Sequence, residues 1–404
     1  MYQYHLILLT TFFLAACSGN DGKVIHPTTE FLEEIKAADY TVSLNDENLP
    51  SISILNNRKT INIIGETEDV DSEYFLPEVG DISVGSKLIF IVIPQMNEIR
   101  AFDYLGNFKY KIGRTGHGPG EFEKLHSIDY DEASKKLVAV DLNEVEIFDV
   151  KPDTAIPSQT FIITQVSHLS DACILNGELF LNGSNISEVD TLESDASIYS
   201  RLQALPPINK YDLETGEKLF HFGKSYKSVS GFGGFDALLS ETKLHCNEST
   251  NTIVGVFSRY PFIAGYDPAN GSEKWNAGIL DFISPQVEEK DIENNVALVP
   301  IRSSFSDKLG PIVELNSEFI LLQTGVRPPH PESLILERLE ILDFRNSKFV
   351  SMLLNTSTGK ISILSDELGR TLFQNDEISI TSPTDLENLE APPTIVIGEP
   401  VFSF

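Results

Sequence analysis

Five side chains of the types that hold metal ions or move protons stand in or just before apolar stretches of the sequence. They are His126, Asp129, His168, Asp171 and His245. Imidazole nitrogens and carboxylate oxygens bind divalent cations where they converge. If the apolar stretches are strands around one axis, these side chains line a central channel as ligand candidates. The alternative, that they are unrelated polar side chains at strand ends, stays open because their spacing matches no known motif.

The stretch from 112 to 122, IGRTGHGPGEF, contains four glycines and raises the question of a phosphate site. A Walker A loop needs Gly-x-x-x-x-Gly-Lys-Ser/Thr, because its N–H groups and its lysine hold the phosphate. Gly113 and Gly118 have that separation, but Pro119 and Gly120 stand where the lysine and the Ser/Thr are required. We therefore interpret the stretch as a connection between two pieces of sheet, in which glycine supplies positive φ angles.

Two basic residues follow the glycines that end apolar stretches. Arg114 is one, and Lys224 in FGKSYKSVSGFGGF (222–235) is the other. They are candidate anion contacts, with ion pairs to neighbours such as Glu121 as the alternative. The sequence contains no Gly-x-Ser-x-Gly, His-Glu-x-x-His, Cys-x-x-Cys or EF-hand pattern.

One structural unit recurs along the chain. Residues 127–150, SIDYDEASKKLVAVDLNEVEIFDV, alternate short apolar runs with polar turns, a pattern typical of antiparallel strands joined by hairpins. Comparable units occupy 80–113, 170–185 with 208–223, 243–278, and 310–325 with 338–354. Without insertions each unit has about 40 to 50 residues, the length of a four-stranded propeller blade.

Four units share an aromatic residue followed by aspartate, at Phe102-Asp103, Phe148-Asp149, Tyr211-Asp212 and Tyr266-Asp267. We expect the aromatic side chain to face the core at the end of the third strand and the aspartate to open the turn. A sixth unit is predicted from 359–382 and an N-terminal strand, SISILNN or TINIIGE, that closes the ring and hides its edges. The predicted fold is all-β, a six-bladed β-propeller with four-stranded antiparallel blades; two stacked β-sandwiches are the alternative.

The chain of 404 residues has a formal net charge of -30, from 60 acidic and 30 basic residues. Nucleic acids and anionic membrane surfaces bind clustered cations, so this balance argues against a nucleic-acid partner. The acidic residues are spread in short groups, which indicates a hydrated exterior.

The first twenty residues, MYQYHLILLTTFFLAACSGN, have the pattern of an export signal, although no Lys or Arg precedes the apolar run. That run, 6–16, is shorter than the about 20 residues that span a bilayer. Its end at Cys17 resembles a bacterial lipobox, whose cysteine becomes lipidated; a buried strand is the alternative. We predict a lipoprotein signal peptide over 1–16, a flexible tether over 17–37 and the propeller over 38–404.

If Cys17 carries lipid, Cys173 and Cys246 are the remaining cysteines. Outside the cytoplasm they are free to form a disulfide. The sequence does not bring their Cα atoms within the required range of roughly 4.4 to 6.8 Å. We expect two buried thiols, with a disulfide as the alternative.

IGRTGHGPGEF, followed by SIDYD and KLVAVD, resembles the six-bladed β-propeller lipoproteins of bacteria. That group is related in pattern to NHL-repeat propellers, whose blade junctions carry a similar Gly-x-Gly-x-Gly-x-Phe. The upstream IIGETEDVDSEYF is similar to a segment of the same group, so the resemblance is most specific over 60–150. It implies a six-bladed propeller on a lipid anchor and carries no catalytic residue. The proline-free second junction and the insertion at 184–207 depart from the pattern.

The absence of catalytic signatures favours a binding module over an enzyme. We expect a lipid-anchored propeller of the cell envelope, at the periplasmic or surface face of the outer membrane, that binds a protein partner or a glycan or peptide fragment. The alternative is a metal-dependent hydrolase or lyase with its site in the central channel, and a structural envelope component is a third. No cofactor is evident from the sequence, and a divalent cation is compatible with the histidines and aspartates named above.

Overall fold

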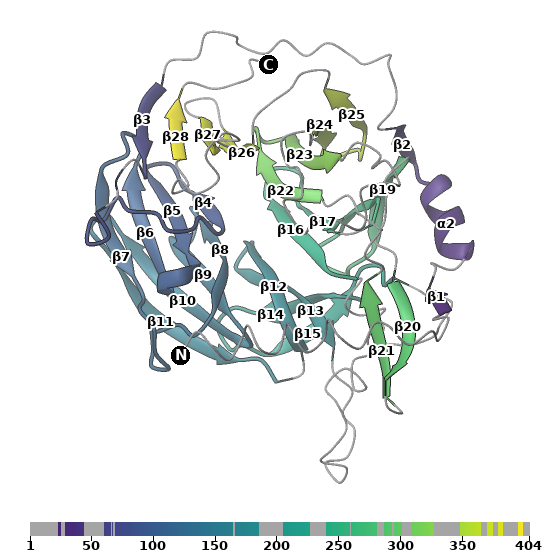
Figure 1. The fold of residues 1–404 in the computed structure, drawn as a ribbon, viewed down its shortest axis with the longest axis horizontal. Coiled ribbons are helices and arrows are strands. Elements are labelled where there is room, and N and C mark those ends of the chain that lie inside the picture. The colour runs from purple at the N-terminus through teal and green to yellow at the C-terminus, as the bar shows by residue number, and fades with distance from the viewer. Residues whose placement is uncertain are drawn as a thin grey trace, which may run out of the picture.

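The computed structural model is a ring of β-sheets around one axis (Figure 1). The structure describes residues 23–25, 29–43, 60–65, 67, 69–164, 166–185, 205–226, 240–258, 260–280, 287–292, 295–300, 309–326, 348–364, 370–374, 379–382 and 395–398. Within them lie five four-stranded sheets, one five-stranded sheet and one small sheet of three strands. The four- and five-stranded sheets are the six predicted blades, which confirms the all-β propeller.

Blades 1 to 3 follow one another along the chain, each running from its inner to its outer strand. Blade 1 contains β4 (Ile82–Val84), β5 (Leu88–Ile93), β6 (Glu98–Asp103) and β7 (Phe108–Ile112), with the 3₁₀ turn η2 (Pro94–Met96) between β5 and β6. Blade 2 contains β8 (Leu125–Asp131), β9 (Lys136–Asp141), β10 (Glu144–Lys151) and β11 (Thr154–Ile162). Blade 3 contains β12 (Val166–Leu175), β13 (Glu178–Asn185), β14 (Ile208–Asp212) and β15 (Lys218–Phe222).

Blades 4 and 6 each include one strand from the N-terminal region, and blade 5 lies between them. Blade 4 contains β16 (Thr242–Asn247), β17 (Thr252–Phe257), β18 (Phe262–Tyr266) and β19 (Glu273–Leu280), and β2 (Tyr40–Ser43) adds to β19 in parallel. Blade 5 contains β22 (Leu309–Glu314), β23 (Phe319–Val326), β24 (Lys348–Asn355) and β25 (Ile361–Leu364). Blade 6 contains β26 (Arg370–Gln374), β27 (Ser379–Ser382), β28 (Ile395–Gly398) and β3 (Thr60–Ile64).

The ring closes between the two ends of the chain, as predicted. The N-terminal strand β3, within TINIIGE, pairs antiparallel with the C-terminal strand β28 and forms the outer edge of blade 6. One boundary differs from the prediction: 361–364 is the outer strand of blade 5, so blade 6 begins at β26 rather than at 359. The predicted unit 127–150 also lacked its outer strand, β11, whose partly exposed residues show weak apolar alternation.

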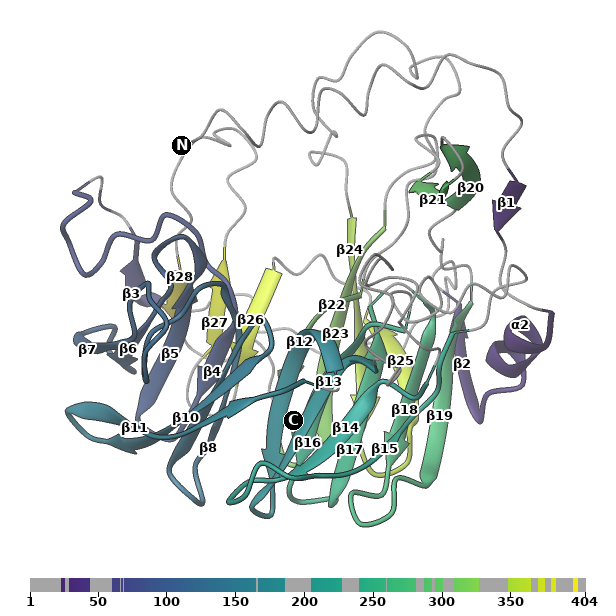
Figure 2. The ribbon, with the colours of Figure 1, turned by 90° about the horizontal axis from the view of Figure 1, so that it is seen from below.

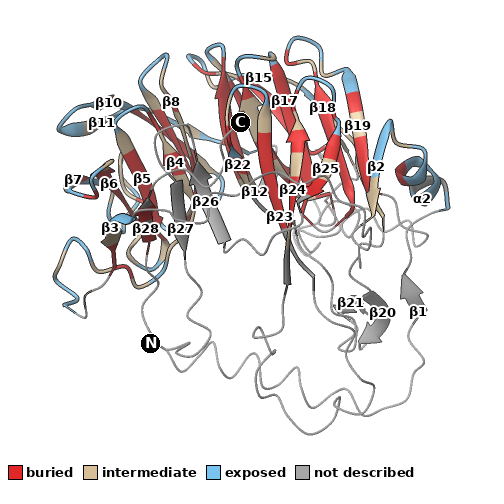
Figure 3. Ribbon diagram, turned by 90° about the horizontal axis from the view of Figure 1, so that it is seen from above, coloured by how far each residue is buried: buried red, intermediate tan, exposed pale blue. Residues whose placement is uncertain are grey.

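The second strands of blades 1, 2 and 4 are continuous apolar runs because neighbouring blades cover both of their faces. β5 has the sequence LIFIVI, β9 KLVAVD and β17 TIVGVF, and nearly every residue in them is buried. Figure 3 shows the burial running through the middle of the blades, with the exposed residues at the connecting turns. The core therefore lies in layers between blades rather than at one centre.

The aromatic-aspartate pairs end the third strands as predicted in three blades. Asp103, Asp212 and Asp267 each accept a hydrogen bond from a backbone N–H two residues further on, which closes the turn. Asp149 differs, because it lies within β10 and pairs with Lys136 at 2.9 Å. Blade 5 makes the same turn with Asn355, whose Oδ1 accepts from the backbone N–H of the residue two positions later.

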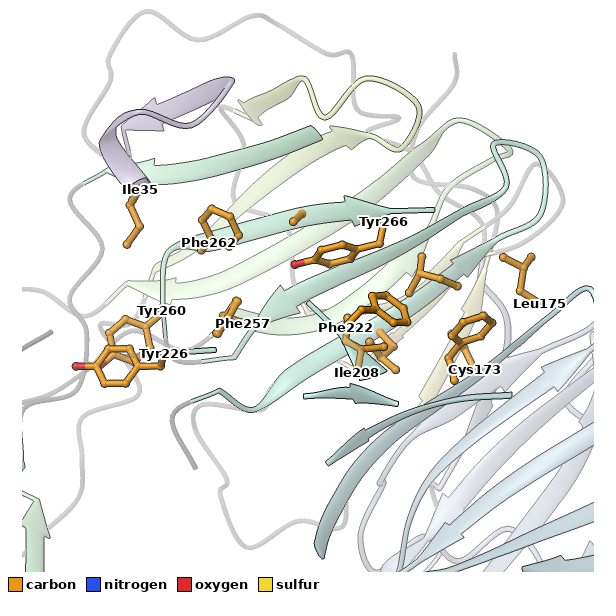
Figure 4. Close-up of a cluster of buried hydrophobic side chains, with 14 residues drawn as sticks. Ile35, Cys173, Leu175, Ile208, Phe222, Tyr226, Phe257, Tyr260, Phe262 and Tyr266 are labelled. Atoms are coloured by element: carbon orange, nitrogen blue, oxygen red, sulfur yellow. The ribbon is translucent and has the colours of Figure 1, made fainter. Parts of the chain in front are cut away.

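The predicted tether, 17–37, contains regular structure that the sequence analysis did not anticipate. β1 (Lys23–Ile25) pairs with β20 (Val287–Ile292), which pairs with β21 (Asn295–Pro300), and α2 (Thr29–Lys36) follows β1. Ile35 of α2 is buried in the apolar cluster of blades 3 and 4, near Phe262 (Figure 4). This contact and β2 hold the N-terminal segment against blade 4.

Candidate functional site

The inner strands β4, β8, β12, β16, β22 and β26 contact one another in this order around the axis, and β26 returns to β4. Residues 81–83 and the strands β8, β12 and β16 each contribute two alternate residues to two rows at the interfaces between blades. Most of these side chains contact the next blade, whereas Lys243 contacts Asp171 of the preceding blade. The first row is Asp81, Ser127, Asp171 and Lys243, and the second row is Ser83, Asp129, Cys173 and His245. Residues between them point back into the preceding core layer, as Ile128 and Leu244 do.

The interface between blades 1 and 2 sets the pattern of these rows. Asp81 Oδ2 accepts a hydrogen bond from the backbone N–H of Ile128 at 3.0 Å. Two residues further along both strands, Ser83 Oγ accepts from the N–H of Tyr130 at 2.9 Å. Each row therefore joins one blade to the backbone of the next.

The next two interfaces repeat the pattern with different chemistry. Asp129 Oδ2 accepts from Ile174 N–H at 3.0 Å, and Asp171 Oδ2 accepts from Leu244 N–H at 2.8 Å. In the second row between blades 3 and 4, the hydrogen bond is replaced by a disulfide between Cys173 and Cys246, with their Cα atoms 5.7 Å apart. The expectation of two thiols is corrected: the sequence could not show that inner strands of adjacent blades bring the two cysteines together.

Burial and mutual repulsion raise the pKa values of acidic side chains in these rows. Burial raises the pKa of Asp129 to about 7, and the Asp171 and Asp81 carboxylates add to the rise against a hydrogen bond from Ile174. Burial also raises the pKa of Asp81, again with a contribution from Asp171. Lys243 shows the complementary shift, since the Asp171 carboxylate raises the pKa of its ammonium group. The inner strands of blades 1 to 4 thus hold acidic groups whose proton affinity is high, with one cation beside them.

The five predicted ligand candidates lie on three adjacent inner strands, β8, β12 and β16. His126 is bound to backbone carbonyls through both ring nitrogens, Nδ1 to Lys124 O at 3.0 Å and Nε2 to Leu169 O. The imidazole of His245 is buried, which lowers its pKa to about 4, and its Nε2 has no hydrogen-bond partner in the structure. The backbone of His168 lies in β12, and its side chain is outside the described residues.

Asp129 and Asp171 interact electrostatically, whereas His126 contacts backbone carbonyls. Within the described ranges, no group of three or more His, Cys, Asp or Glu side chains is arranged to hold a metal ion. The sequence analysis missed Asp81, Ser127 and Lys243, which share the first row with Asp171. Their signal was positional: each begins or precedes the first strand of a unit, one residue before an apolar residue.

Both predicted anion contacts take part in ion pairs within the chain. Arg114 Nε donates to Glu121 Oε1 at 2.7 Å, and Glu121 also accepts from the N–H of Gly118 at 3.0 Å. The Gly118 hydrogen bond and the Arg114 guanidinium lower the pKa of Glu121. Lys224 Nζ lies 3.3 Å from Glu34 of α2. The glycine-rich stretch is therefore closed by its own acid and base, as a connection between blades 1 and 2.

The two faces of the ring differ in the length of their connections. From β4 to β28, the connections between first and second strands and between third and fourth strands have two to six residues. We call this side the turn face. The connections at the other ends of the strands include 65–81, 113–124, 186–207, 223–241, 281–308, 327–347 and 383–394. We call this side the long-connection face; β20 and β21 belong to it, and Figure 2 shows them with β1 on one side of the ring.

Six antiparallel blades that follow one another around an axis, joined by paired contacts of their inner strands, define the chain as a six-bladed β-propeller. Residues 63–151 match the model of the DUF5128 family, which is described as a 6-bladed beta-propeller. The matched range covers β4 to β10 and the segment that leads into them.

Two solved structures share the fold. One is a putative exported protein from Bacteroides fragilis NCTC 9343, with 12% identity, a TM-score of 0.50, and coverage of 89% of this chain and 98% of that chain. The other is a member of the DUF4221 family from Bacteroides vulgatus ATCC 8482, with 12% identity, a TM-score of 0.52, and coverage of 87% of this chain and 99% of that chain. No curated protein matches the sequence. Among the helices in the described ranges, none has the length and apolar character to cross a bilayer.

Proposed function

We propose that the chain is a lipid-anchored propeller of the cell envelope that binds a partner protein, or a glycan or peptide fragment, on its long-connection face. The observation that carries the proposal is the contrast between the two faces. The connections on the turn face have two to six residues, whereas those on the long-connection face have up to 28 residues. Binding residues are commonly found on long connections that a rigid scaffold positions.

The scaffold is suited to such a role because its blades are fixed to one another. The two rows of inner-strand contacts and the disulfide join neighbouring blades. The β3–β28 pairing joins the two ends of the chain within blade 6. Opening the ring therefore requires breaking contacts between blades or the hydrogen bonds between β3 and β28. Relative positions of the connections on one face are therefore set by the ring.

Location outside the cytoplasm is supported by three observations of different kinds. The disulfide between Cys173 and Cys246 is the type of crosslink that persists in oxidising compartments. A structure of the same fold is a putative exported protein. The first 17 residues have the pattern of a lipoprotein signal with Cys17 as the lipidated residue.

The lipid anchor and the long-connection face are close to each other in the chain. β1 begins at Lys23, six residues after Cys17, and pairs with β20 of the connection 281–308. Six extended residues span at most about 20 Å. An anchored ring would therefore hold its long-connection face near the membrane, with the turn face directed away.

The experiment is site-specific photocross-linking in cells with the full-length chain. A photoreactive residue replaces His117 on the long-connection face or Ala269 in a turn of the opposite face; both positions are exposed. We expect one discrete adduct from position 117 and none from position 269. Equal adducts from both positions, or none from either position or from a second long-connection site at Glu123, would refute the proposed binding face.

The anchor has a separate test. Incorporation of a labelled fatty acid and sedimentation with membranes are compared between the wild type and Cys17→Ala. We expect both to be lost in the variant. Labelling that persists in Cys17→Ala would show that this cysteine is not the lipidated residue, and the binding proposal would then stand without the anchor.

A further inference from the structure

The hydroxyl of Ser127 lies between two carboxyl groups from different blades. Ser127 Oγ is 2.9 Å from Asp81 Oδ2 of blade 1 and 2.8 Å from Asp171 Oδ1 of blade 3. Ser127 is fully buried and Asp171 nearly so. This is the one place in the described part of the inner strands where side chains of three consecutive blades meet through a single atom.

Counting hydrogens shows that the two contacts cannot both be donated by the serine. A hydroxyl has one proton to donate, and an ionised carboxylate can only accept. If both aspartates were ionised, one carboxylate oxygen would face a serine lone pair, and two negative charges would share a buried site. A proton on one of the carboxyl groups removes both conflicts, because that group then donates to the serine oxygen.

The surroundings indicate which carboxyl group holds the proton. Lys243 Nζ lies 3.9 Å from Asp171 Oδ2, which favours the ionised form of Asp171. Backbone N–H bonds do not distinguish the two acids, because Asp171 accepts from Ala172 and Leu244 and Asp81 accepts from Ile82 and Ile128. The ammonium group beside Asp171 therefore makes the difference. We propose that Asp81 is a protonated carboxylic acid that donates to Ser127, which in turn donates to the Asp171 carboxylate, so that one buried proton joins blades 1, 2 and 3.

The other charged groups around this junction are all on the inner strands. β8 contributes Asp129 and His126, β12 contributes Asp171, and β16 contributes Lys243 with Glu241 just before it. Asp129 is an acid whose pKa burial raises to about 7, so it adds negative charge as the pH rises past neutrality. Lys243 interacts with Asp171, Asp81 and Glu241.

The proton makes the stability of the junction depend on pH. An aspartate whose pKa is raised by folding stabilises the fold below the pKa of the unfolded residue, about 3.9, and this stabilisation is lost as the pH rises through the folded-state pKa. The three-blade junction therefore stabilises the fold most in acid, and this stabilisation decreases as Asp81 ionises. The carboxylates would then repel each other across Ser127.

The test measures the proton itself. Infrared spectra of the whole chain with ¹³C-labelled aspartate are recorded from pH 5 to 9, and the carbonyl stretch of protonated carboxyl groups is followed in the wild type and in Asp81→Asn. We expect one more protonated aspartate in the wild type than in Asp81→Asn at pH 6, where exposed aspartates are ionised. Glu78→Gln, an exposed acid three residues away, is the control and should leave the band unchanged.

Ser127→Ala and the wild-type titration keep the test independent of how well the asparagine variant folds. Without the serine link, the band should titrate away at a pH shifted from that of the wild type by roughly one unit or more. Asp129 also contributes to the band at pH 6, so the proposal is judged on the part that Asp81→Asn removes. It is wrong if the wild type and Asp81→Asn show equal bands at pH 6, or if Ser127→Ala leaves the titration of the band unchanged. It is equally wrong if the band appears only after chelation, because a cation and not a proton would then join the two carboxylates.

Discussion

Reduction of the disulfide between Cys173 and Cys246 should lower the stability of the ring by several kcal/mol. The two cysteines are 73 residues apart. In the chain-entropy model, closing a loop of that length removes about 4 kcal/mol of conformational freedom from the unfolded chain, and losing native disulfides commonly costs about 2 to 5 kcal/mol. The position adds to the effect, because no hydrogen bond replaces the disulfide in the second row between blades 3 and 4.

The assay is urea unfolding of residues 18–404 at pH 7, followed by circular dichroism, with and without a phosphine reductant. Reduction is preferred to mutation because it leaves no cavity. The double variant Cys173→Ala/Cys246→Ala is the control, and reductant should not change its midpoint. Ser83→Ala provides the scale, since it removes the equivalent hydrogen bond between blades 1 and 2, worth about 1 kcal/mol.

A loss below about 1 kcal/mol on reduction would refute the reasoning. It would mean that residual structure already restricts the unfolded chain or that the two sulfurs are not joined in solution. Mass spectrometry after alkylation of free thiols separates these cases, because an unmodified mass requires the disulfide.

Three further predictions concern single residues. Arg100 is buried, with its guanidinium 2.7 Å from Glu98 and donating to backbone carbonyls, so Arg100→Ala should cost about 3 to 5 kcal/mol in urea unfolding. Arg114 forms an exposed ion pair, so Arg114→Ala should cost less than about 1 kcal/mol. Equal losses in the two variants would contradict the expectation that the buried pair contributes more. The pKa of His245 falls to about 4 on folding, so the contribution of this residue to stability is lost as the pH drops from about 6.5 toward 4, while those of Asp81 and Asp129 change in the opposite direction. The thermal stability of His245→Gln relative to the wild type should therefore rise as the pH falls over this range, and a constant difference would show that His245 does not titrate there. Gly113 has φ +84°, and a Cβ there would lie 2.2 Å from the Phe122 ring, so Gly113→Ala should be clearly less stable than Gly177→Ala, which has φ +76° and open space around it.

Much of the ring could be predicted from the sequence because its signals are local. Apolar runs such as LIFIVI and KLVAVD are continuous because blades cover both faces, and aspartates such as Asp103 close turns through bonds to residues two positions away. The Asn176-Gly177 turn has positive φ at both residues, as this pair predicts. β11 was missed because its exposed residues carry little periodicity. The alternating strand 361–364 was assigned to blade 6 because its pattern fits the end of one blade as well as the start of the next.

The inner-strand contacts could not be predicted because they depend on residues more than 40 positions apart. Ser127 meets Asp81 and Asp171 only when three blades are assembled at fixed angles. Nothing in the local sequence distinguishes Asp171 as a partner of a serine and a lysine from a metal ligand. His126 illustrates the same limit, because one of its two carbonyl partners, Leu169 O, is 43 positions away.

The pairing of β3 with β28 has a consequence for how the protein is made. A chain that emerges N-terminus first presents residues 60–64 long before residues 395–398 exist, so the strand that completes the last blade must wait without a partner for nearly the whole of synthesis and export. A premature stop codon before β28 would not yield a smaller ring. It would leave an open one with a gap at blade 6 and an unsatisfied strand at the opposite end of the chain, a species that proteases and chaperones recognise readily.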